Sequence, residues 1–259
     1  MDNFTFLQNY QELQKDVMYN EIIDLGFAKV GFCEIEKSFF WNNAIVDKIL
    51  NNDELHLINK TLKTKSRNSA IYFEHKEKLQ PLIAFLENNE YKKRAEDSWM
   101  FYGGNDVNLS GLNKIKKVEN ENDLNIFIDT FDKCYQKDDP QNPYGTLGDY
   151  LKITKDVWYK HHKSNRLEYF MAYKGDQPVA VASLNNYNNI GYILNVGSLR
   201  EVRGEGFGKF ATLYCVKVSK DRGNTVHCLA TEENTYPNEF YERIGFNTRF
   251  TGCCYVLDK

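Results

Sequence analysis

Hydrophobic residues recur with two different spacings along the chain, and each spacing predicts one kind of element. Near the C-terminus, Phe207, Phe210, Ala211, Tyr214 and Val218 are three or four residues apart, which predicts a helix that ends near Gly223. Short apolar runs over 169–173, 179–184 and 192–196 instead predict strands, and the turn-forming segments between them predict two hairpins. From about residue 112 the expected order is a strand, two helices, three antiparallel strands, then helix, strand, helix and two strands. This order is typical of a mixed α+β sheet.

The first hundred residues show the same two spacings in a different order. Helices are expected over 1–25, a strand over 27–35 and a helix that begins at Asp53. A short strand over 70–73, a helix to about residue 88 and a strand over 92–102 follow. The pattern then breaks at Gly103-Gly104-Asn105-Asp106. We therefore predict two domains, a smaller α/β domain at 1–105 and a second domain at 106–259.

A glycine-rich turn separates the strand over 192–196 from the helix that follows it. It reads Arg203-Gly204-Glu205-Gly206-Phe207-Gly208. A strand, a tight turn and a helix with free N–H groups in its first turn form an anion site, and glycines let the backbone approach the ligand. A P-loop would need Gly-Lys-Ser/Thr, whereas Phe210 follows Gly208-Lys209. A dinucleotide fingerprint would follow the first strand of a parallel unit rather than an antiparallel hairpin.

Several motifs together resemble the GNAT superfamily of N-acetyltransferases. The turn at 203–208 matches that family's R/Q-x-x-G-x-G/A signature, and Asn234 followed by 240–246 (FYERIGF) is similar to its Asn and F/L-Tyr-Glu-x-x-Gly-Phe elements. The match is partial at 200–202, where Arg-Glu-Val stands in place of the frequent Pro-Glu-Tyr. The resemblance covers about residues 112–259. It implies the acyl-CoA N-acyltransferase fold, a mixed, mainly antiparallel central sheet flanked by helices.

The resemblance also implies a cosubstrate and its binding residues. Acetyl-CoA would donate its acetyl group directly to a primary amine in a ternary complex, without a metal or a covalent enzyme intermediate. Its pyrophosphate would bind backbone amides of the turn, its pantetheine arm would pair with 195–199, and Asn234 would either bond that arm or cap a helix. The expected cofactor-binding residues are Ser198, Leu199, Arg203, Gly204, Glu205, Gly206, Phe207, Gly208, Lys209 and Asn234.

Proton transfer needs an acid for the leaving thiolate and a base for the amine. Tyr241 is the candidate acid, because a phenol with a pKa of about 10 stays protonated where a thiol with a pKa of about 8.5 ionises. The alternative is that Tyr241 is a core aromatic of an amphipathic helix. Glu232 and Glu233 follow a predicted strand end and are candidate bases, although each could equally be a solvated surface charge. Glu201 is a weaker third candidate.

The composition and net charge of the chain argue against several classes of binding partner. The net charge of -3 and a pI near 6.0 argue against nucleic-acid or anionic-membrane binding. The chain has no apolar run of the ~20 residues that a membrane span needs. Its N-terminus does not resemble a signal peptide and its six cysteines have no zinc-like spacing, so we expect a cytoplasmic protein with free thiols. The expected partner is a small-molecule or peptide amine, and a homodimer is one alternative for the oligomeric state.

Two questions stay open at this point. The segment 85–91 can be laid over 240–246, which puts Leu86 where Tyr241 stands, so the N-terminal domain is either a degenerate GNAT-like copy or a chance similarity. If the repeat is real, the copy is expected to have no cofactor site, because nothing before residue 85 resembles the R-x-x-G-x-G signature. The alternative functions are a catalytically idle acyl-CoA-binding or sensing module and a tRNA-dependent transferase, and the acidic balance disfavours the latter. Amino acids, aminoglycosides, polyamines and protein N-termini all remain as acceptors.

Overall fold

The computed structural model describes residues 1–104, 107, 109 and 114–257, and its chain divides into two compact units. Unit 1 comprises Met1–Trp99 and Arg249–Lys259, and unit 2 comprises Met100–Thr248. The last eleven residues thus count with unit 1, whereas the sequence pattern groups them with the second domain. Of the predicted boundary at 103–106, Asn105 and Asp106 lie outside the described residues.

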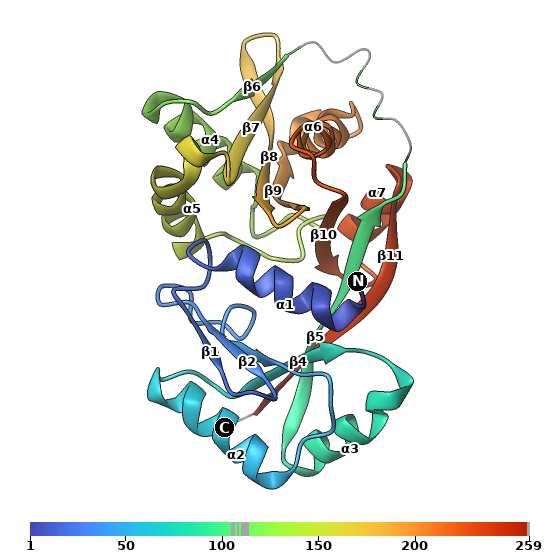
Figure 1. The fold of residues 1–259 in the computed structure, drawn as a ribbon. Helices are drawn as coiled ribbons and strands as arrows, with labels where there is room; N and C mark the ends of the chain where they lie inside the picture. Colours follow the sequence, from blue (N-terminus) through green and yellow to red (C-terminus); the bar gives the residue numbers. More distant parts are fainter. Residues whose placement is uncertain (105–106, 108, 110–113, 258–259) are drawn as a thin grey trace. The chain divides into compact units, whose positions relative to one another are not determined.

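Unit 1 is built from short strands and three α-helices (Figure 1). Its elements are α1 Asn3–Gln14, β1 Glu21–Asp24, β2 Lys29–Phe32, β3 Asn43–Ile45, α2 Asn52–Thr64, β4 Ala70–Glu74, α3 Gln80–Asn88, β5 Tyr91–Tyr102 and β11 Phe246–Leu257. The strands are hydrogen-bonded in the order β1-β2-β3-β4-β11-β5, and β5 and β11 also contain residues of unit 2. The core forms where the apolar faces of α2 and α3 meet this sheet, as shown by the fully buried Ile58, Phe73 and Leu82.

Unit 2 has a sheet with helices on both faces. Its elements are β6 Ile115–Lys117, α4 Glu121–Cys134, α5 Asp149–His161, β7 Leu167–Lys174, β8 Gln177–Tyr187, β9 Ile190–Ser198, α6 Phe207–Asp221, β10 Val226–Glu232 and α7 Tyr236–Arg243. The order is β10-β9-β8-β7-β6, antiparallel except for the parallel pair β9–β10. Figure 1 shows α4 and α5 on one side of β7–β9 and α6 on the other. The predicted fold class, a mixed and mainly antiparallel sheet flanked by helices, is confirmed.

Two local predictions were wrong. The helix α2 begins two residues earlier than expected, because Asn51 and not Asp53 is its N-cap. The two strands expected over 247–250 and 253–257 are one strand, β11, which runs through Gly252 opposite Glu74. A Cβ at Gly252 would lie 2.2 Å from the Tyr72 hydroxyl oxygen, so this glycine allows a close approach inside the strand instead of ending it.

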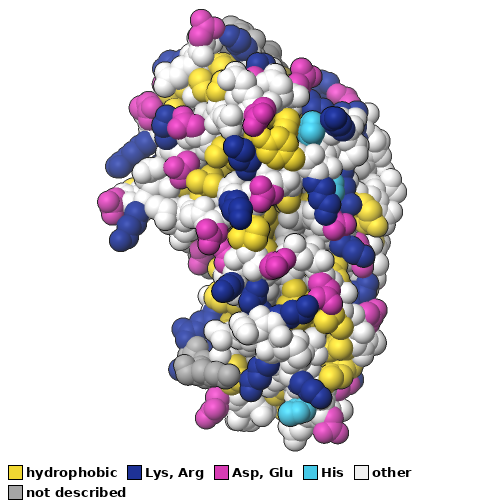
Figure 2. All heavy atoms as spheres, turned by 90° about the vertical axis from the view of Figure 1, so that its left-hand side faces the viewer, with side chains coloured by type: hydrophobic (Ala, Val, Ile, Leu, Met, Phe, Trp, Pro, Cys, Tyr) yellow, Lys and Arg dark blue, Asp and Glu magenta, His cyan; other side chains and the backbone are white. Residues whose placement is uncertain are grey.

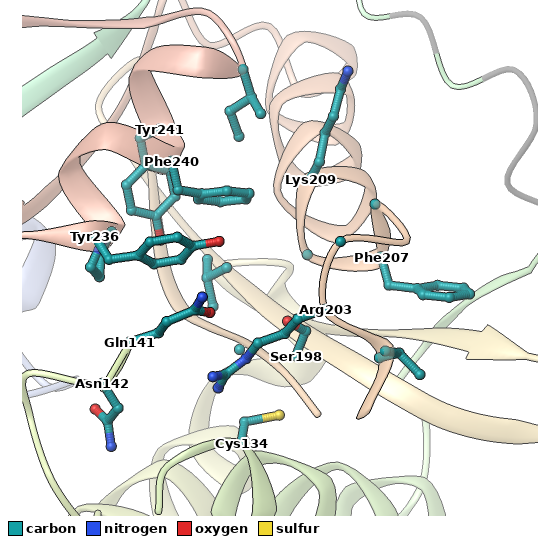
Figure 3. Close-up of a pocket in the computed structure, with 18 of the residues that line it drawn as sticks. Cys134, Gln141, Asn142, Ser198, Arg203, Phe207, Lys209, Tyr236, Phe240 and Tyr241 are labelled. Carbon is teal, nitrogen blue, oxygen red and sulfur yellow. The ribbon is translucent and has the colours of Figure 1, made fainter. Parts of the chain in front are cut away.

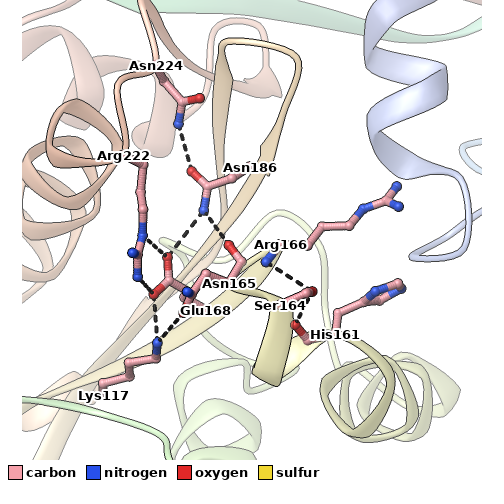
Figure 4. Close-up of polar contacts among 9 residues, drawn as sticks. All are labelled: Lys117, His161, Ser164, Asn165, Arg166, Glu168, Asn186, Arg222 and Asn224. Carbon is pink, nitrogen blue, oxygen red and sulfur yellow. Dashed lines mark hydrogen bonds and ion pairs between the residues drawn. The ribbon is translucent and has the colours of Figure 1, made fainter.

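A buried ionic network fixes the C-terminal end of α6 (Figure 4). The Glu168 side chain on β7 is only 1% exposed and accepts hydrogen bonds from Lys117 (2.8 Å) and from Arg222, the C-cap of α6 (2.7 Å). Asn186 donates to the same carboxylate and accepts from Asn224 just after the helix. A buried charge needs such partners to offset its lost hydration. The network therefore sets the direction of α6, whose other end is the glycine turn.

Surface charge is mixed on the face drawn in Figure 2, where Lys and Arg side chains alternate with Asp and Glu side chains. The drawn face has no continuous basic patch.

Candidate functional site

A cavity of about 400 Å³ in unit 2 brings together three segments that are far apart in the sequence (Figure 3). They are the end of β9 with the glycine turn and the start of α6, the helix α7, and the end of α4 with the loop that follows it. A pocket of this volume is large enough to hold a sizeable part of a ligand. The lining residues from the three segments include Cys134, Tyr135, Gln141, Asn142, Tyr144, Ser198, Arg203, Gly204, Gly206, Phe207, Gly208, Lys209, Tyr236, Phe240, Tyr241 and Arg243.

The strands β9 and β10 separate at this cavity. Their parallel register runs from Ile190 to Tyr192 on β9, whereas β9 itself continues to Ser198. A β-bulge also interrupts β9, where Asn195 adopts a left-handed φ of 54°. The Asn195 side chain accepts a hydrogen bond from the Tyr150 hydroxyl (2.8 Å) and donates one to Ser183 (3.2 Å), which holds the bulge in place. Bulges re-aim strands next to functional sites, and here the bulged end of β9 borders the cavity.

The glycine turn leaves the N-terminus of α6 open. Gly204 and Gly206 have φ values of 83° and 90°, which an L-residue with a side chain rarely adopts. Gly206 is the N-cap of α6 and provides no side-chain hydrogen bond to the helix. The first intrahelical bond runs from the Phe210 N–H to the Gly206 carbonyl (2.9 Å), so the amides of residues 207–209 precede the hydrogen-bonded turns. These amides and the helix dipole favour an anion in the cavity.

An ion pair joins the glycine turn to the loop after α4. The Arg203 guanidinium donates from both terminal nitrogens to the two carboxylate oxygens of Asp139, with 2.7 Å between Nη1 and Oδ1. Asp139 is 5% exposed, and the hydrogen bonds from Arg203 keep the pKa of its carboxyl below the usual value. The same carboxylate accepts the Gln141 N–H at 3.0 Å. Asp139 therefore fixes both the direction of Arg203 and the start of the loop that carries Gln141.

Tyr241 lies on α7 and lines the cavity, although it is only 9% exposed. Its ring packs edge-on against Phe240 and Phe246, with centroid distances of 5.1 and 5.8 Å. Burial raises the pKa of its hydroxyl, and the neighbouring Tyr144 and Cys215 add to the shift. The side chain is thus a neutral phenol at physiological pH with access to the cavity.

The structure places eight of the sequence-predicted site residues around the cavity and five away from it. Those that line it are Ser198, Arg203, Gly204, Gly206, Phe207, Gly208, Lys209 and Tyr241. Leu199 does not, because its N–H donates to the Val179 carbonyl (2.9 Å) and its side chain is buried. Glu205 points elsewhere, since its carboxylate pairs with Lys174 at 2.7 Å and its N–H donates to Val202.

The remaining three, Glu232, Glu233 and Asn234, are not among the residues that line the cavity. Glu232 ends β10, and Glu233 and Asn234 form the turn that leads to α7. Asn234 adopts a left-handed φ of 58°. The Glu232 carbonyl accepts a hydrogen bond from Thr235 (2.7 Å), and its N–H donates to the Tyr144 hydroxyl (3.3 Å). The backbone of this turn therefore supports the cavity wall through Tyr144.

The sequence reasoning missed part of the lining, above all Tyr135 and Tyr236. The loop over 138–148 is predictable as a site-lining segment from its two prolines and two glycines, and Gln141, Asn142 and Tyr144 of this loop do line the cavity. Tyr135 gave no such signal, since it reads as the last apolar residue of a helix. In the structure it is the C-cap of α4 and donates its hydroxyl hydrogen to the Val196 carbonyl at 2.7 Å. The neighbouring Cys134 is an unreactive thiol, because burial raises its pKa to about 12.

Among the described residues, no group of three or more His, Cys, Asp or Glu side chains is arranged to hold a metal ion. None of the helices in the described part of the chain combines the length and the apolar character needed to cross a bilayer.

Comparisons with known proteins agree with this geometry. The chain resembles a GCN5-related N-acetyltransferase from Kribbella flavida (15% identity, TM-score 0.68, 98% of this chain and 95% of that one). It also resembles a GCN5-related N-acetyltransferase from Sphaerobacter thermophilus (12% identity, TM-score 0.62, 92% of this chain and 83% of that one). A third similar structure is a tandem GNAT protein from the clavulanic acid biosynthesis pathway (10% identity, TM-score 0.55, 88% of this chain and 77% of that one). At these identities the likeness concerns the fold. No curated protein sequence matches the chain significantly. Residues 125–246 match the acetyltransferase (GNAT) family, and the chain therefore contains a GNAT-family domain in unit 2.

Proposed function

We propose that the protein transfers an acetyl group from acetyl-CoA to a primary amine of a small molecule or peptide, directly and within a ternary complex. The observation that carries the proposal is that one cavity is bordered by both an open helix N-terminus and a buried, neutral phenol. The first suits a polyanionic cosubstrate, and the second suits a leaving group that needs a proton. The GNAT-family match over residues 125–246 supports the same conclusion.

The residues present fit acetyl-CoA. The amides of Phe207, Gly208 and Lys209 would hold the pyrophosphate, with the Lys209 and Arg203 side chains adding positive charge on the same side of the cavity. A Cβ built at Gly204 or Gly206 would meet no atom within 4 Å, so a positive φ rather than crowding explains these glycines. The bulged end of β9 at 195–198 would take the pantetheine arm, because its register with β10 has ended. The Ser198 N–H remains the proposed donor to the acetyl carbonyl, and Leu199 is replaced in that role because its N–H is bonded within the sheet.

The chemical step requires that the amine nitrogen bond to the thioester carbon while the carbon–sulfur bond breaks. We assign Tyr241 as the general acid that gives its hydroxyl proton to the departing sulfur. Its raised pKa keeps the proton in place until the thiolate forms. The amine must lose a proton to a base, and Glu232 and Glu233 remain the proposed bases. Since neither residue lines the cavity, each would act through a water molecule.

The test is to measure binding and turnover separately for the full chain. Calorimetry with acetyl-CoA reports binding, and release of the CoA thiol over a panel of amines reports turnover. Replacing Tyr241 with Phe should lower turnover ~100-fold, the usual contribution of a general acid, and leave the dissociation constant of acetyl-CoA within about twofold. The matched control is Tyr187→Phe, which makes the same change at an exposed position of β8 that does not line the cavity.

Each alternative has its own outcome. Binding of acetyl-CoA without turnover of any amine above the uncatalysed rate, in wild type and Tyr241→Phe alike, would indicate an idle acyl-CoA-binding module. If acetyl-CoA does not bind at all, the proposed function is wrong.

A further inference from the structure

The cavity has two chemically different sides. On the side of α6, the glycine turn presents backbone amides and the cationic side chains of Arg203 and Lys209. The rest of the lining includes Tyr135, Tyr144, Tyr236 and Tyr241, which we call the tyrosine wall. Gln141 lies between the two parts, because its N–H and the Arg203 guanidinium bond the same Asp139 oxygen. Figure 3 shows the Tyr236 hydroxyl and the Gln141 amide pointing into the space that faces Arg203. If the first side takes the phosphates, the tyrosine wall is left for the acceptor.

The tyrosine wall carries no negative charge. Within the described residues that line the cavity there is no Asp or Glu, and the charged ones are Arg203, Lys209 and Arg243. The nearby carboxylate of Asp139 is buried and bonded to Arg203 through both oxygens. Glu239 pairs with Arg243 at 3.5 Å on the surface of α7. The proposed bases Glu232 and Glu233 lie outside the lining. A second ammonium group on an acceptor would therefore find no unpaired carboxylate within the lining itself.

The wall is held in place by its own hydrogen bonds. The Tyr135 hydroxyl donates to Val196, and the Tyr144 hydroxyl lies 2.9 Å from the Thr231 hydroxyl, so both rings are anchored to the ends of β9 and β10. The two rings are 6.4 Å apart, centroid to centroid. A pre-formed aromatic surface of this kind suits the flat or apolar body of a ligand, and the ring faces attract a single cationic head.

One polar atom of the cavity lining has no partner in the described part of the protein. The Gln141 Oε1 atom is buried and accepts no hydrogen bond from any described residue. The adjacent Asn142 differs, because its amide donates to the carbonyls of Gln136 and Gly145 and accepts the Tyr144 N–H. The Asn142 amide thus shapes the loop, whereas the Gln141 amide is available to one N–H group of a ligand.

We propose that the acceptor is a primary monoamine with an aromatic or otherwise apolar body, bound against the tyrosine wall with its nitrogen near Gln141. This inference rests on the proposed function and narrows its substrate class. Polyamines and aminoglycosides are excluded as good acceptors, because each additional ammonium would lose its hydration next to neutral side chains. Gln141 is a specificity-determining residue in this account.

The experiment compares three probe amines with wild-type protein and acetyl-CoA: 2-phenylethylamine, spermidine and kanamycin. The expected result is a kcat/KM for 2-phenylethylamine at least tenfold above those for the other two. Replacing Gln141 with Glu adds one carboxylate to the lining and should raise the spermidine to 2-phenylethylamine ratio by about fivefold, the factor that one partly exposed ion pair supplies. The matched control is Gln136→Glu, the same change at an exposed position of the same loop outside the cavity, and it should leave the ratio unchanged.

Three results would overturn the inference. The first is a wild-type preference for spermidine or kanamycin, and the second is an unchanged ratio in Gln141→Glu. The third is acetyl-CoA binding, seen by calorimetry, with no turnover of 2-phenylethylamine; this result rejects the acceptor class alone. Failure to bind acetyl-CoA would instead reject the proposed function, so the two failures can be told apart.

Discussion

The segments 43–102 and 190–257 pass through the same five elements in the same order, β3-α2-β4-α3-β5 and β9-α6-β10-α7-β11. In both, the first two strands pair in parallel across a helix, with Ala44 opposite Ile71 and Ile190 opposite Val226. Two parallel strands need such a crossover connection. Of the two interpretations left open for residues 1–105, a degenerate copy and a chance similarity, we propose the degenerate copy of the acyltransferase fold, which this agreement favours.

The agreement extends to single residues where α3 and α7 end. The C-cap N–H groups of Asn89 and Ile244 each donate to the carbonyls two and three residues earlier. The next residue is left-handed in both, Glu90 with φ 66° and Gly245 with φ 102°. The overlay of 85–91 on 240–246 thus pairs positions with the same backbone conformation.

The two segments differ at the N-terminus of the first helix. In α2, Asn51 accepts the Glu54 N–H and Glu54 in turn accepts the Asn51 N–H, a complete capping box. In α6 the N-cap is Gly206, which offers no side-chain hydrogen bond. Leu86, at the position of Tyr241, is fully buried in the core of unit 1. The two features that border the cavity of unit 2, an open helix N-terminus and a phenol on the last helix, thus correspond in unit 1 to a capped helix and a core leucine.

The largest expected effect comes from closing the open helix. The double variant Gly206→Asn/Lys209→Glu gives α6 the residue types of the α2 capping box and reverses one charge. Acetyl-CoA affinity should fall ~100-fold, because Asn is strained at the φ of 90° that Gly206 adopts, which disturbs the turn, and the added carboxylate repels phosphate. Calorimetry measures this change. The control is Lys217→Glu, which reverses a charge at an exposed position of the same helix and should leave acetyl-CoA affinity within twofold. An equal loss of affinity in both variants would contradict the proposed role of the α6 N-terminus.

The next effect concerns the left-handed residue after α7. Gly245→Ala should lower the free energy of unfolding by about 2 kcal/mol, since an L-residue with a Cβ is disfavoured at positive φ. The new Cβ would also lie 3.2 Å from the Tyr102 ring. Urea denaturation followed by circular dichroism measures the change. The control is Gly175→Ala, at φ 61° in the hairpin turn between β7 and β8, where a Cβ would meet no atom within 4 Å. This variant carries the backbone strain alone and should lower the free energy of unfolding by less. An equal loss of unfolding free energy in both variants would show that the contact with Tyr102 contributes nothing.

Local chemistry explains which parts of the molecule could be predicted from sequence. The glycine turn is recognisable because its conformation and its ligand both depend on adjacent backbone groups, and Tyr241 follows from the helix motif around it. By contrast, the pairing of Arg203 with Asp139 joins residues 64 positions apart through a loop whose path is set by tertiary contacts. The continuity of β11 through Gly252 depends on Tyr72, which no local pattern contains.

The candidate bases illustrate the same limit. Glu232 and Glu233 were placed correctly at the end of β10, but the direction of their side chains depends on the turn that follows. Asn234 is left-handed there, and the Glu232 backbone is bonded at both ends, to Thr235 and Tyr144. Spacing along the chain gives the end of a strand to within a residue or two. It does not give the side to which a turn directs its carboxylates.

A smaller effect is expected where the helix N-terminus is closed. Asn51→Ala removes the side-chain acceptor of the α2 capping box and should lower the free energy of unfolding by about 1 kcal/mol. Acetyl-CoA affinity should stay unchanged, because this helix belongs to unit 1 and lines no part of the cavity. The same denaturation and calorimetry experiments apply, with Asn51→Asp as the control that keeps a capping oxygen and should retain most of the stability. A change in affinity would show that the α2 terminus contributes to the site after all.

The smallest effect should have the opposite sign. Glu90 adopts the left-handed conformation that Gly245 adopts in the second copy, but it carries a side chain. Glu90→Gly should relieve a conformational cost of about 1–2 kcal/mol, offset by the 0.5–1 kcal/mol that glycine's greater freedom in the unfolded chain costs, for a net gain of about 0.5 kcal/mol. Glu90→Ala is the matched control, because it removes the carboxylate and keeps the Cβ, and it should give no gain. If Glu90→Ala stabilises the protein as much as Glu90→Gly does, the gain comes from removing the carboxylate and not from the backbone conformation of Glu90. The correspondence between the ends of α3 and α7 would then lose its energetic basis.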